Sequence, residues 1–173
     1  MPFTDLEPTQ MPKLDRDEEK GLILENGKRV ISFRVATFQA LVNRLRGMTG
    51  SQVAGTILFG LGNEIGQTAF RYSKDKVMSD NLVKVFDDII RHRGWGRCLA
   101  IEKQADRSAY VFTMSECPLC YGQKATEAMC DLMRGIVTGW VEAFVNKKAT
   151  KAVETECAAM GSKFCIFEAT MQE

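Results

Sequence analysis

Residues 153–168 read VETECAAMGSKFCIFE and are typical of a β-hairpin. Strands are predicted over residues 150–156 and 163–171, because both runs contain residues that favour strands, and the segment around Gly161 supplies the turn between them. The hairpin also carries one glutamate and two cysteines at short spacing. It therefore has the side chains of a metal site as well as the pattern of a strand pair.

A structural zinc site is predicted from four side chains. Glu154, Cys157 and Cys165 belong to the hairpin, and Cys130 lies on the helix predicted to precede it. Zinc favours thiolate and carboxylate ligands in closed four-coordinate structural sites, so these residues would tie the helix to the hairpin. The alternative is that the cysteines are small buried apolar side chains, since free cysteine is among the most buried residue types.

A Cys-x-x-Cys pair competes with this set of ligands. Cys117 and Cys120, in the run SECPLCYG, have the spacing of half a zinc knuckle and of a thioredoxin-type redox motif. The parallel βαβ setting of the redox motif is not predicted here. A metal site could combine this pair with two later cysteines. The sequence leaves open whether the two thiols bind metal, pair with each other or are free.

The predicted order of elements indicates an α+β fold with an antiparallel sheet. A short strand is followed by three helices, two strands, a helix and the final hairpin, and this mixed order argues against a βαβ array. Residues 1–27 are expected to form a mobile N-terminal arm, and residues 28–173 a single domain. The predicted ranges are 29–35 for the first strand, 37–45, 51–72 and 80–93 for the three helices, 97–103 and 108–114 for the middle strands, and 125–145 for the last helix.

Composition and charge favour a cytoplasmic globular protein. The chain has 23 basic and 22 acidic residues, so its net charge of +1 gives no electrostatic footprint for nucleic acid. No apolar run approaches the roughly 20 residues of a membrane span, and the N-terminus has no signal-peptide core. Thiols stay reduced in the cytoplasm, which sets metal binding against the alternative of three disulfides from six cysteines.

The sequence holds no complete catalytic constellation, so we expect a protein that is not an enzyme. His92 is the single histidine, which excludes a two-histidine site within one chain, and it is expected to be a solvated helix-end cation. A nucleophile elbow, a Walker loop and an HExxH motif are missing. The glycines of residues 60–66 lack the preceding strand of a dinucleotide site, and those of residues 135–139 indicate close helix packing.

The C-terminal half of the chain resembles the 4-vinyl reductase (4VR) domain family. The residues that carry the resemblance are Cys130, Gly135, Gly139, the run 153–157, Gly161, the run 164–168 and the turn Gly94-Trp95-Gly96. The resemblance implies a fold of the NO-signalling/Golgi-transport ligand-binding-domain type. Such a fold has a four-stranded antiparallel sheet, here with a short additional N-terminal strand, packed by about four helices, and the proteins are usually homodimers. The fold group includes aromatic-sensing domains of bacterial activators and subunits of a vesicle-tethering complex.

The resemblance also implies a structural zinc. The aromatic sensors hold zinc with Cys, Glu, Cys and Cys, and the matching residues here are Cys130, Glu154, Cys157 and Cys165. The interval from Cys130 to Glu154 is about a residue longer than in the sensors, a difference that the intervening loop could absorb.

An apolar ligand site between helices and sheet is implied as well. The sensors orient phenols with a histidine and a tryptophan, and His92 and Trp95 are residues of the right types. From helical and strand phase, the expected lining is Phe59, Ile65, Phe70, Phe86, Ile90, His92, Trp95, Phe112, Trp140 and Phe144. The alternative for each apolar side chain is that it fills the core.

Three functions follow from these observations. The first is a non-enzymatic module with a structural zinc and an apolar pocket, acting as sensor or carrier of a hydrophobic small molecule, aromatic or tetrapyrrole-like. The second is an assembly or scaffold factor with a protein partner, in photosynthetic pigment-protein or photosystem biogenesis. The third is a component of a vinyl-tetrapyrrole reductase, although the sequence supplies no nicotinamide or flavin site.

Overall fold

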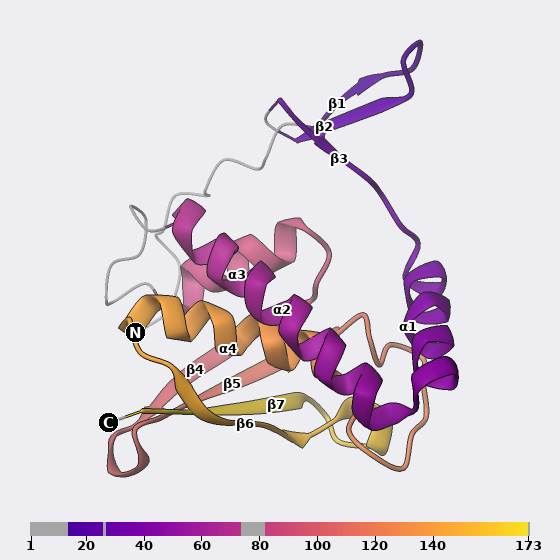
Figure 1. The fold of residues 1–173 in the computed structure, drawn as a ribbon. Helices are drawn as coiled ribbons and strands as arrows, with labels where there is room; N and C mark the ends of the chain where they lie inside the picture. The colour runs from indigo at the N-terminus through magenta and orange to yellow at the C-terminus, as the bar shows by residue number, and fades with distance from the viewer. Residues whose placement is uncertain (1–13, 26, 74–81, 173) are drawn as a thin grey trace. The chain divides into compact units, whose positions relative to one another are not determined.

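The computed structural model describes residues 14–25, 27–73 and 82–172, which divide into two compact units after Arg34 (Figure 1). In the first unit, three strands form an antiparallel sheet in the order β1-β2-β3. The strands are β1 (Leu14–Asp17), β2 (Leu22–Glu25) and β3 (Lys28–Val30). The division lies later in the chain than the predicted end of the arm at residue 27.

The structure corrects the expectation of little structure before Leu22. The charged run of residues 15–20 favours disorder by its composition, but Asp17 closes a turn. Its carboxylate accepts hydrogen bonds from the Lys20 N–H and from Lys20 Nζ, both at 3.0 Å. Gly21 continues this turn with a left-handed φ of 61°. The strand predicted over residues 29–35 is also too long, because β3 ends at Val30.

The second unit contains the predicted four-stranded antiparallel sheet, in the order β4-β5-β7-β6. Its strands are β4 (Arg97–Gln104), β5 (Ala109–Ser115), β6 (Ala149–Glu156) and β7 (Cys165–Met171). Burial alternates along β5 and β7, so one face of the sheet faces the core. Phe112 and Phe167 lie opposite each other on that face.

Four helices complete the second unit within the described residues. They are α1 (Val35–Thr49), α2 (Ser51–Ser73), α3 (Leu82–His92) and α4 (Asp131–Val145). In Figure 1, α4 lies over the sheet and α2 crosses over α4. None of the helices in the described segments has both the length and the apolar character needed to cross a bilayer.

Helix α4 begins later than predicted. The expected helix over residues 125–145 starts only at Asp131, and α2, not α4, is the longest helix described. The preceding segment has good helix-forming residues, but its backbone bonds elsewhere: the Ala125 N–H donates to the Ala159 carbonyl at 3.0 Å. Tertiary contacts therefore override local helix propensity and leave Cys130 at the N-cap.

Glycines allow α2 and α4 to touch through their backbones, as the sequence predicts. A Cβ atom on Gly62 or Gly66 of α2 would overlap the carbonyl oxygen of Leu132 or Ile136. Cβ atoms on Gly135 and Gly139 of α4 would meet α2 in the same way. Without side chains at these positions, the two helices approach more closely than helices with larger interface residues can.

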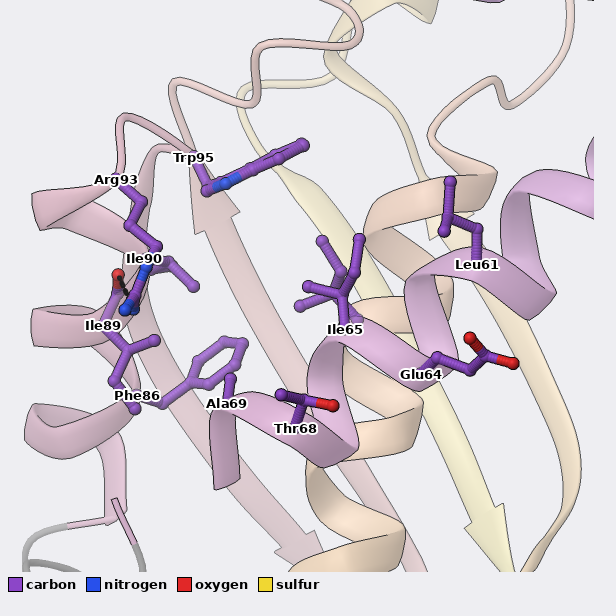
Figure 2. A pocket seen from close by; sticks show the side chains of 11 residues that line it. Leu61, Glu64, Ile65, Thr68, Ala69, Phe86, Ile89, Ile90, Arg93 and Trp95 are labelled. Atoms are coloured by element: carbon purple, nitrogen blue, oxygen red, sulfur yellow. Dashed lines mark hydrogen bonds between the residues drawn. The ribbon is translucent and has the colours of Figure 1, made fainter. Parts of the chain in front are cut away.

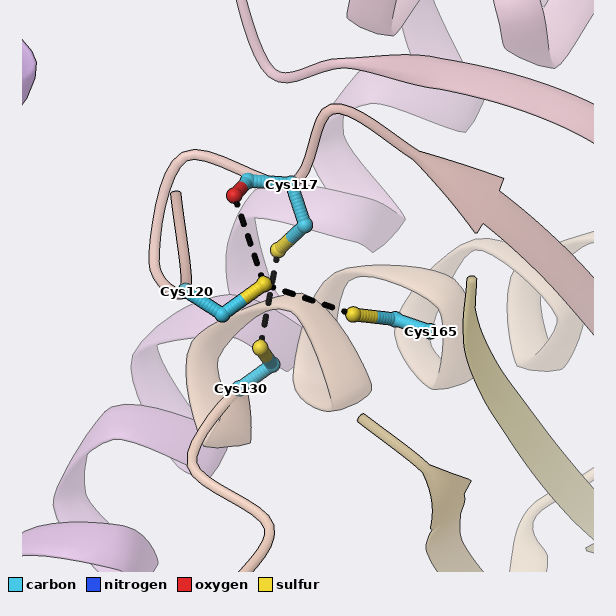
Figure 3. A group of neighbouring side chains, drawn as sticks. All are labelled: Cys117, Cys120, Cys130 and Cys165. Carbon is cyan, nitrogen blue, oxygen red and sulfur yellow. Dashed lines mark hydrogen bonds between the residues drawn. The ribbon is translucent and has the colours of Figure 1, made fainter. Parts of the chain in front are cut away.

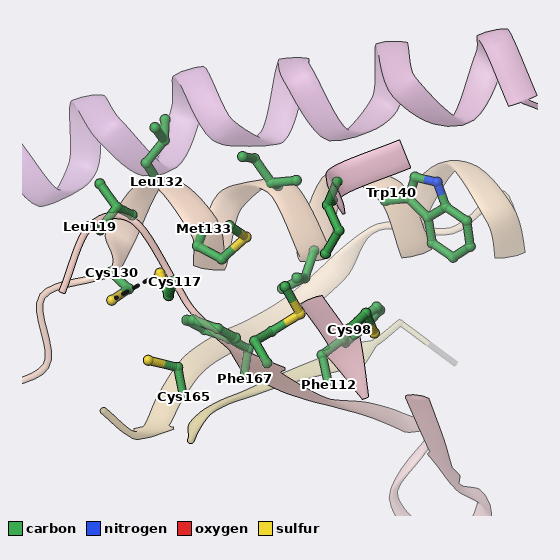
Figure 4. Close-up of a cluster of buried hydrophobic side chains, with 14 of the residues drawn as sticks. Cys98, Phe112, Cys117, Leu119, Cys130, Leu132, Met133, Trp140, Cys165 and Phe167 are labelled. Carbon is green, nitrogen blue, oxygen red and sulfur yellow. Dashed lines mark hydrogen bonds between the residues drawn. The ribbon is translucent and has the colours of Figure 1, made fainter. Parts of the chain in front are cut away.

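The core lies between α4 and the sheet (Figure 4). An aromatic cluster extends it toward α2 and α3. Trp140 is fully buried, and its ring centroid lies 4.9 Å from that of Phe86 and 5.7 Å from that of Phe70. Phe86 also contacts Phe112 of β5 at 5.5 Å. Helices from both layers are therefore joined to the sheet through rings.

Candidate metal centre

Five cysteines and one glutamate meet where α4 begins. Cys117 and Cys120 lie in the loop after β5, and Cys130 precedes the first residue of α4. Glu154 belongs to β6, Cys157 follows that strand, and Cys165 opens β7. The sheet brings these elements together, because β7 pairs with β5 on one side and with β6 on the other.

The sulfur atoms lie at the separations expected around a metal ion. Cys117 Sγ is 3.6 Å from Cys130 Sγ, Cys120 Sγ is 3.4 Å from Cys165 Sγ, and Cys130 Sγ is 3.9 Å from Cys157 Sγ. A tetrahedral ion with Zn–S bonds of about 2.3 Å holds its sulfur ligands about 3.8 Å apart. The distances thus suit ligands that share an ion.

Two four-ligand sets satisfy this geometry. The ligand atoms of Cys117, Cys120, Cys130 and Cys165 lie within 4.8 Å of one another (Figure 3). The ligand atoms of Cys130, Glu154, Cys157 and Cys165 do the same. The second set is the one predicted from the sequence. The first includes the Cys-x-x-Cys pair, whose role the sequence leaves open.

The carboxylate of Glu154 is incompletely satisfied by the protein. Its Oε2 accepts a hydrogen bond of 2.8 Å from the Cys130 N–H. Its Oε1 is buried and has no hydrogen-bond partner within the described residues. Burial raises the pKa of this carboxyl to about 8. A cation beside Oε1 would supply the missing partner, so the donor set fits a metal.

The thiols influence one another's ionisation. Hydrogen bonding to Cys130 lowers the pKa of Cys157 to about 5. Hydrogen bonding to Cys117 lowers the pKa of Cys120 and raises that of Cys130. Without a cation, the cluster is therefore a mixture of thiolates and thiols. A metal ion would replace the shared protons, as thiolate ligation requires.

Residues of α1 hold the loop that carries Cys117 and Cys120. Gln39 is buried, and its Nε2 donates to the carbonyls of Pro118 at 2.9 Å and Tyr121 at 2.8 Å. Gln123 Nε2 donates in turn to Gln39 Oε1 at 3.1 Å. A glutamine on an otherwise amphipathic helix gives no sequence signal for such a role, and the sequence analysis misses it.

The sixth cysteine lies apart from the cluster. Cys98 in β4 is buried, its Sγ contacts the Ala100 carbonyl at 3.5 Å, and burial raises its pKa to about 12. All six cysteines are free thiols, so the three-disulfide alternative is not realised.

A separate pocket lies between α2 and α3 (Figure 2). Its volume is about 350 Å³. It is lined by Leu61, Glu64, Ile65, Thr68, Ala69, Phe86, Ile89, Ile90, Arg93, Trp95 and Ile136. Trp95 is fixed by an edge-to-face contact with Phe38 of α1, at a centroid distance of 5.5 Å. The lining is apolar, with Glu64, Thr68 and Arg93 as its polar members.

The pocket and the expected ligand residues overlap in part. Ile65, Phe86, Ile90 and Trp95 line it. The other expected residues lie outside this lining, namely Phe59, Phe70, His92, Phe112, Trp140 and Phe144. Most of these side chains form the aromatic cluster of the core, because the helix faces that carry them turn toward one another. Phe59 packs instead under the Arg134 guanidinium, 4.8 Å from its ring centroid.

Comparison with known proteins identifies the C-terminal region. Residues 110–171 match the family model of the vinyl-4-reductase (4VR) domain, a segment that runs from β5 to the end of β7 and includes all six ligands of the two sets. The chain carries a 4VR domain. The resemblance to the 4-vinyl reductase family is thereby confirmed.

Two uncharacterized proteins of Methanocaldococcus jannaschii are similar to this 4VR protein in sequence. One is 24% identical over 134 residues, covering 77% of this chain and 73% of the relative. The other is 30% identical over 112 residues, covering 63% of this chain. The alignment spans 47%, less than half, of that second relative.

Solved structures show that the 4VR protein shares its fold with three kinds of domain. The phenol-responsive sensory domain of the transcription activator PoxR, solved with phenol, has a TM-score of 0.74 at 18% identity, over 91% of this chain and 84% of that one. A vinyl-4-reductase family protein of Methanocaldococcus jannaschii has 0.55 at 18%, over 83% and 85%. A trafficking protein particle complex subunit 3 from Naegleria fowleri, covalently bound to palmitic acid, has 0.59 at 16%, over 80% and 93%.

Proposed function

We propose that this 4VR protein is a non-enzymatic binding module, a sensor or carrier of a small aromatic molecule, with a structural zinc that stabilises the site. The observation that carries the proposal is the apolar pocket between α2 and α3. Apolar walls with few polar groups are typical of small-molecule sites. The fold shared with a phenol-responsive sensory domain supports the same function.

The size of the pocket favours a ligand of one or two rings. Its volume of about 350 Å³ is near the lower end of the usual range for ligand sites, about 300–1,000 Å³. A tetrapyrrole macrocycle joins four five-membered rings in one plane and needs more room. An aromatic ligand is therefore better supported than the tetrapyrrole-like one that the sequence also allows.

The polar groups of the pocket set a further requirement on the ligand. Thr68 and Arg93 come from different parts of the chain, and Arg93 already donates to the Ile89 carbonyl at 3.4 Å. Glu64 adds a carboxylate on the α2 side. A ligand with an apolar ring and one hydroxyl could bury the ring against Phe86 and Trp95 and keep the hydroxyl near these groups.

The zinc in this proposal has a structural role. Three thiols and a carboxylate from α4 and the β6-β7 hairpin form the predicted set, and the orphaned oxygen of Glu154 supports a cation there. Closed four-ligand sites of this kind leave no open position for substrate. The ion would fix α4, and α4 contributes Ile136 to the pocket.

Thermal unfolding with phenol and indole tests the proposal. Binding to the folded state should raise the melting temperature with ligand concentration. Substituting Ile65→Trp fills the pocket and should abolish the shift, whereas Thr56→Trp, on an exposed position of the same helix, should preserve it. Absence of any shift in the wild type, with a range of one- and two-ring compounds, would reject the proposal.

A second function, homodimeric assembly, is favoured by the surface of α2. Val53, Ile57, Leu61 and Ile65 recur every four residues and are between 37% and 52% exposed. Such a stripe is typical of a helix that packs against a partner. Light scattering on the wild type and on Val53→Glu/Ile57→Glu tests this. A monomeric mass for the wild type at all concentrations would reject it.

A further inference from the structure

We propose that the cysteine cluster binds two zinc ions at once, with Cys130 and Cys165 as bridging thiolates. Cys117 and Cys120 would complete the coordination of one ion, and Glu154 and Cys157 that of the other. The inference rests on the structural zinc proposed above and extends it by a second ion. It gives the Cys-x-x-Cys pair a role that the predicted zinc site does not require.

The set with the Cys-x-x-Cys pair is complete in itself. Its four thiols are at most 4% exposed and come from the loop after β5, the N-cap of α4 and the start of β7. Figure 3 shows the four sulfur atoms converging on one point from these elements. Atoms that all lie within 4.8 Å of one another leave room for a single ion between them. Four buried thiolates at this spacing are typical ligands of structural zinc.

The set with Glu154 makes its own demand for a cation. Glu154 Oε1 is buried without a hydrogen-bond partner in the described part of the chain. An unpaired buried carboxylate oxygen is costly, and the Cys130 N–H satisfies only Oε2. An ion placed among the four thiols of the first set would leave this oxygen, and the Cys157 thiol, without a metal bond.

One ion in either set therefore leaves two buried ligands unused. The sets share Cys130 and Cys165, so each ion reaches four ligands only if both of these sulfurs bind both ions. A thiolate sulfur has enough lone pairs to bridge two metals. Fully ionised, the five thiols and one carboxylate carry six negative charges. One Zn²⁺ offsets two of these charges and two Zn²⁺ offset four, which lowers the cost of burying the cluster.

The surroundings of the bridging sulfurs favour this charge state. Cys130 is the N-cap of α4, where the helix dipole favours negative charge. The Ala158 N–H points at Cys165 Sγ from 3.4 Å. With both ions bound, the loop after β5 would be tied to α4 and to the final hairpin through a single cluster.

Metal stoichiometry tests the inference directly. The chain is expressed with zinc, and native mass spectrometry with elemental analysis should find two zinc ions per chain. The double variants Cys117→Ser/Cys120→Ser and Glu154→Gln/Cys157→Ser should each retain one. Cys98→Ser, which removes the buried cysteine outside the cluster, should retain two.

Cadmium substitution supplies a readout that does not depend on the variants folding. The cadmium-113 spectrum of the wild type should show two resonances, one from the all-sulfur site and one from the site with a carboxylate. One ion per chain, unchanged by Cys117→Ser/Cys120→Ser, or a Cys117–Cys120 disulfide in the native protein, would overturn the inference and leave the structural zinc standing. No bound metal at all would overturn both.

Discussion

Single side chains link the layers of this domain, and Glu142 is the clearest case. It lies in the last turn of α4 and is buried. Its Oε1 accepts from the Ala149 N–H at 2.9 Å, and its Oε2 accepts from Lys148 Nζ at 3.0 Å and from Asn63 Nδ2 at 3.2 Å. One carboxylate thereby connects α4, α2 and the start of β6.

Glu142→Ala should lower the free energy of unfolding by about 1–3 kcal/mol, because it leaves buried donors without an acceptor. Urea denaturation at pH 7 measures this loss. Lys147→Ala, at an exposed neighbouring position, is the control and should cost less than about 0.5 kcal/mol. An equal effect of the two substitutions would contradict the assigned role.

Glu142 also predicts a pH dependence. Burial acts to raise its pKa, but the hydrogen bonds from Ala149, Lys148 and Asn63 outweigh burial and hold the pKa below its ordinary value of 4.5. A lowered pKa contributes stability that is present above the unfolded-state value and is lost as the pH falls through the folded-state value. The wild type should therefore lose more stability below about pH 4.5 than Glu142→Gln does. Parallel denaturation curves across this range would exclude the effect.

Cys98 should react slowly with alkylating reagents. Its thiol is buried, and burial raises its pKa to about 12, so the reactive thiolate is scarce at neutral pH. Mass spectrometry after brief iodoacetamide treatment of the folded chain should find Cys98 unmodified. Full modification of Cys98 within the folded lifetime would contradict the burial seen here.

At the scale of elements, the crossing of α2 and α4 depends on glycines. Gly66→Ala or Gly139→Ala places a methyl group against the backbone of the facing helix, so either should cost several kcal/mol or prevent folding. Gly60→Ala is the matched control, because nothing lies within 4 Å of its Cβ position. It should stabilise α2 by about 1 kcal/mol. Circular dichroism during thermal unfolding distinguishes the two results, and a neutral Gly66→Ala would contradict the close crossing.

The sequence predicts these elements better than it predicts their contacts. Periodicity and turn residues locate the sheet and place α2 almost to the residue, and Cys130, Glu154, Cys157 and Cys165 are brought together as expected. Periodicity alone does not determine which partner a helix face meets. Phe112 and Trp140 therefore lie in the core and not in the pocket, and the start of α4 depends on a contact with Ala159. The sequence could not choose between Cys-x-x-Cys pairings, because that choice rests on distances across the chain.

At the scale of the whole molecule, metal binding should account for a large share of stability. Ligands from α4 and the final hairpin are close only in the folded state, so metal-binding energy becomes folding energy. Prolonged chelation should lower the free energy of unfolding by at least about 4 kcal/mol, the value for a ligand at a thousand times its Kd. Guanidinium denaturation measures this, with Cys157→Ser expected to lose the response to added zinc. Identical curves with and without chelator would contradict a structural role.

The central claim is that the pocket between α2 and α3 binds a small aromatic molecule. Methyl NMR of the isoleucine residues during a titration with phenol or indole tests it most directly. Ile65, Ile89, Ile90 and Ile136 line the pocket, and their signals should shift with a common saturation curve, while exposed Ile57 on α2 stays unchanged. Shifts confined to Ile57, or no shifts in any of these signals, would contradict the claim.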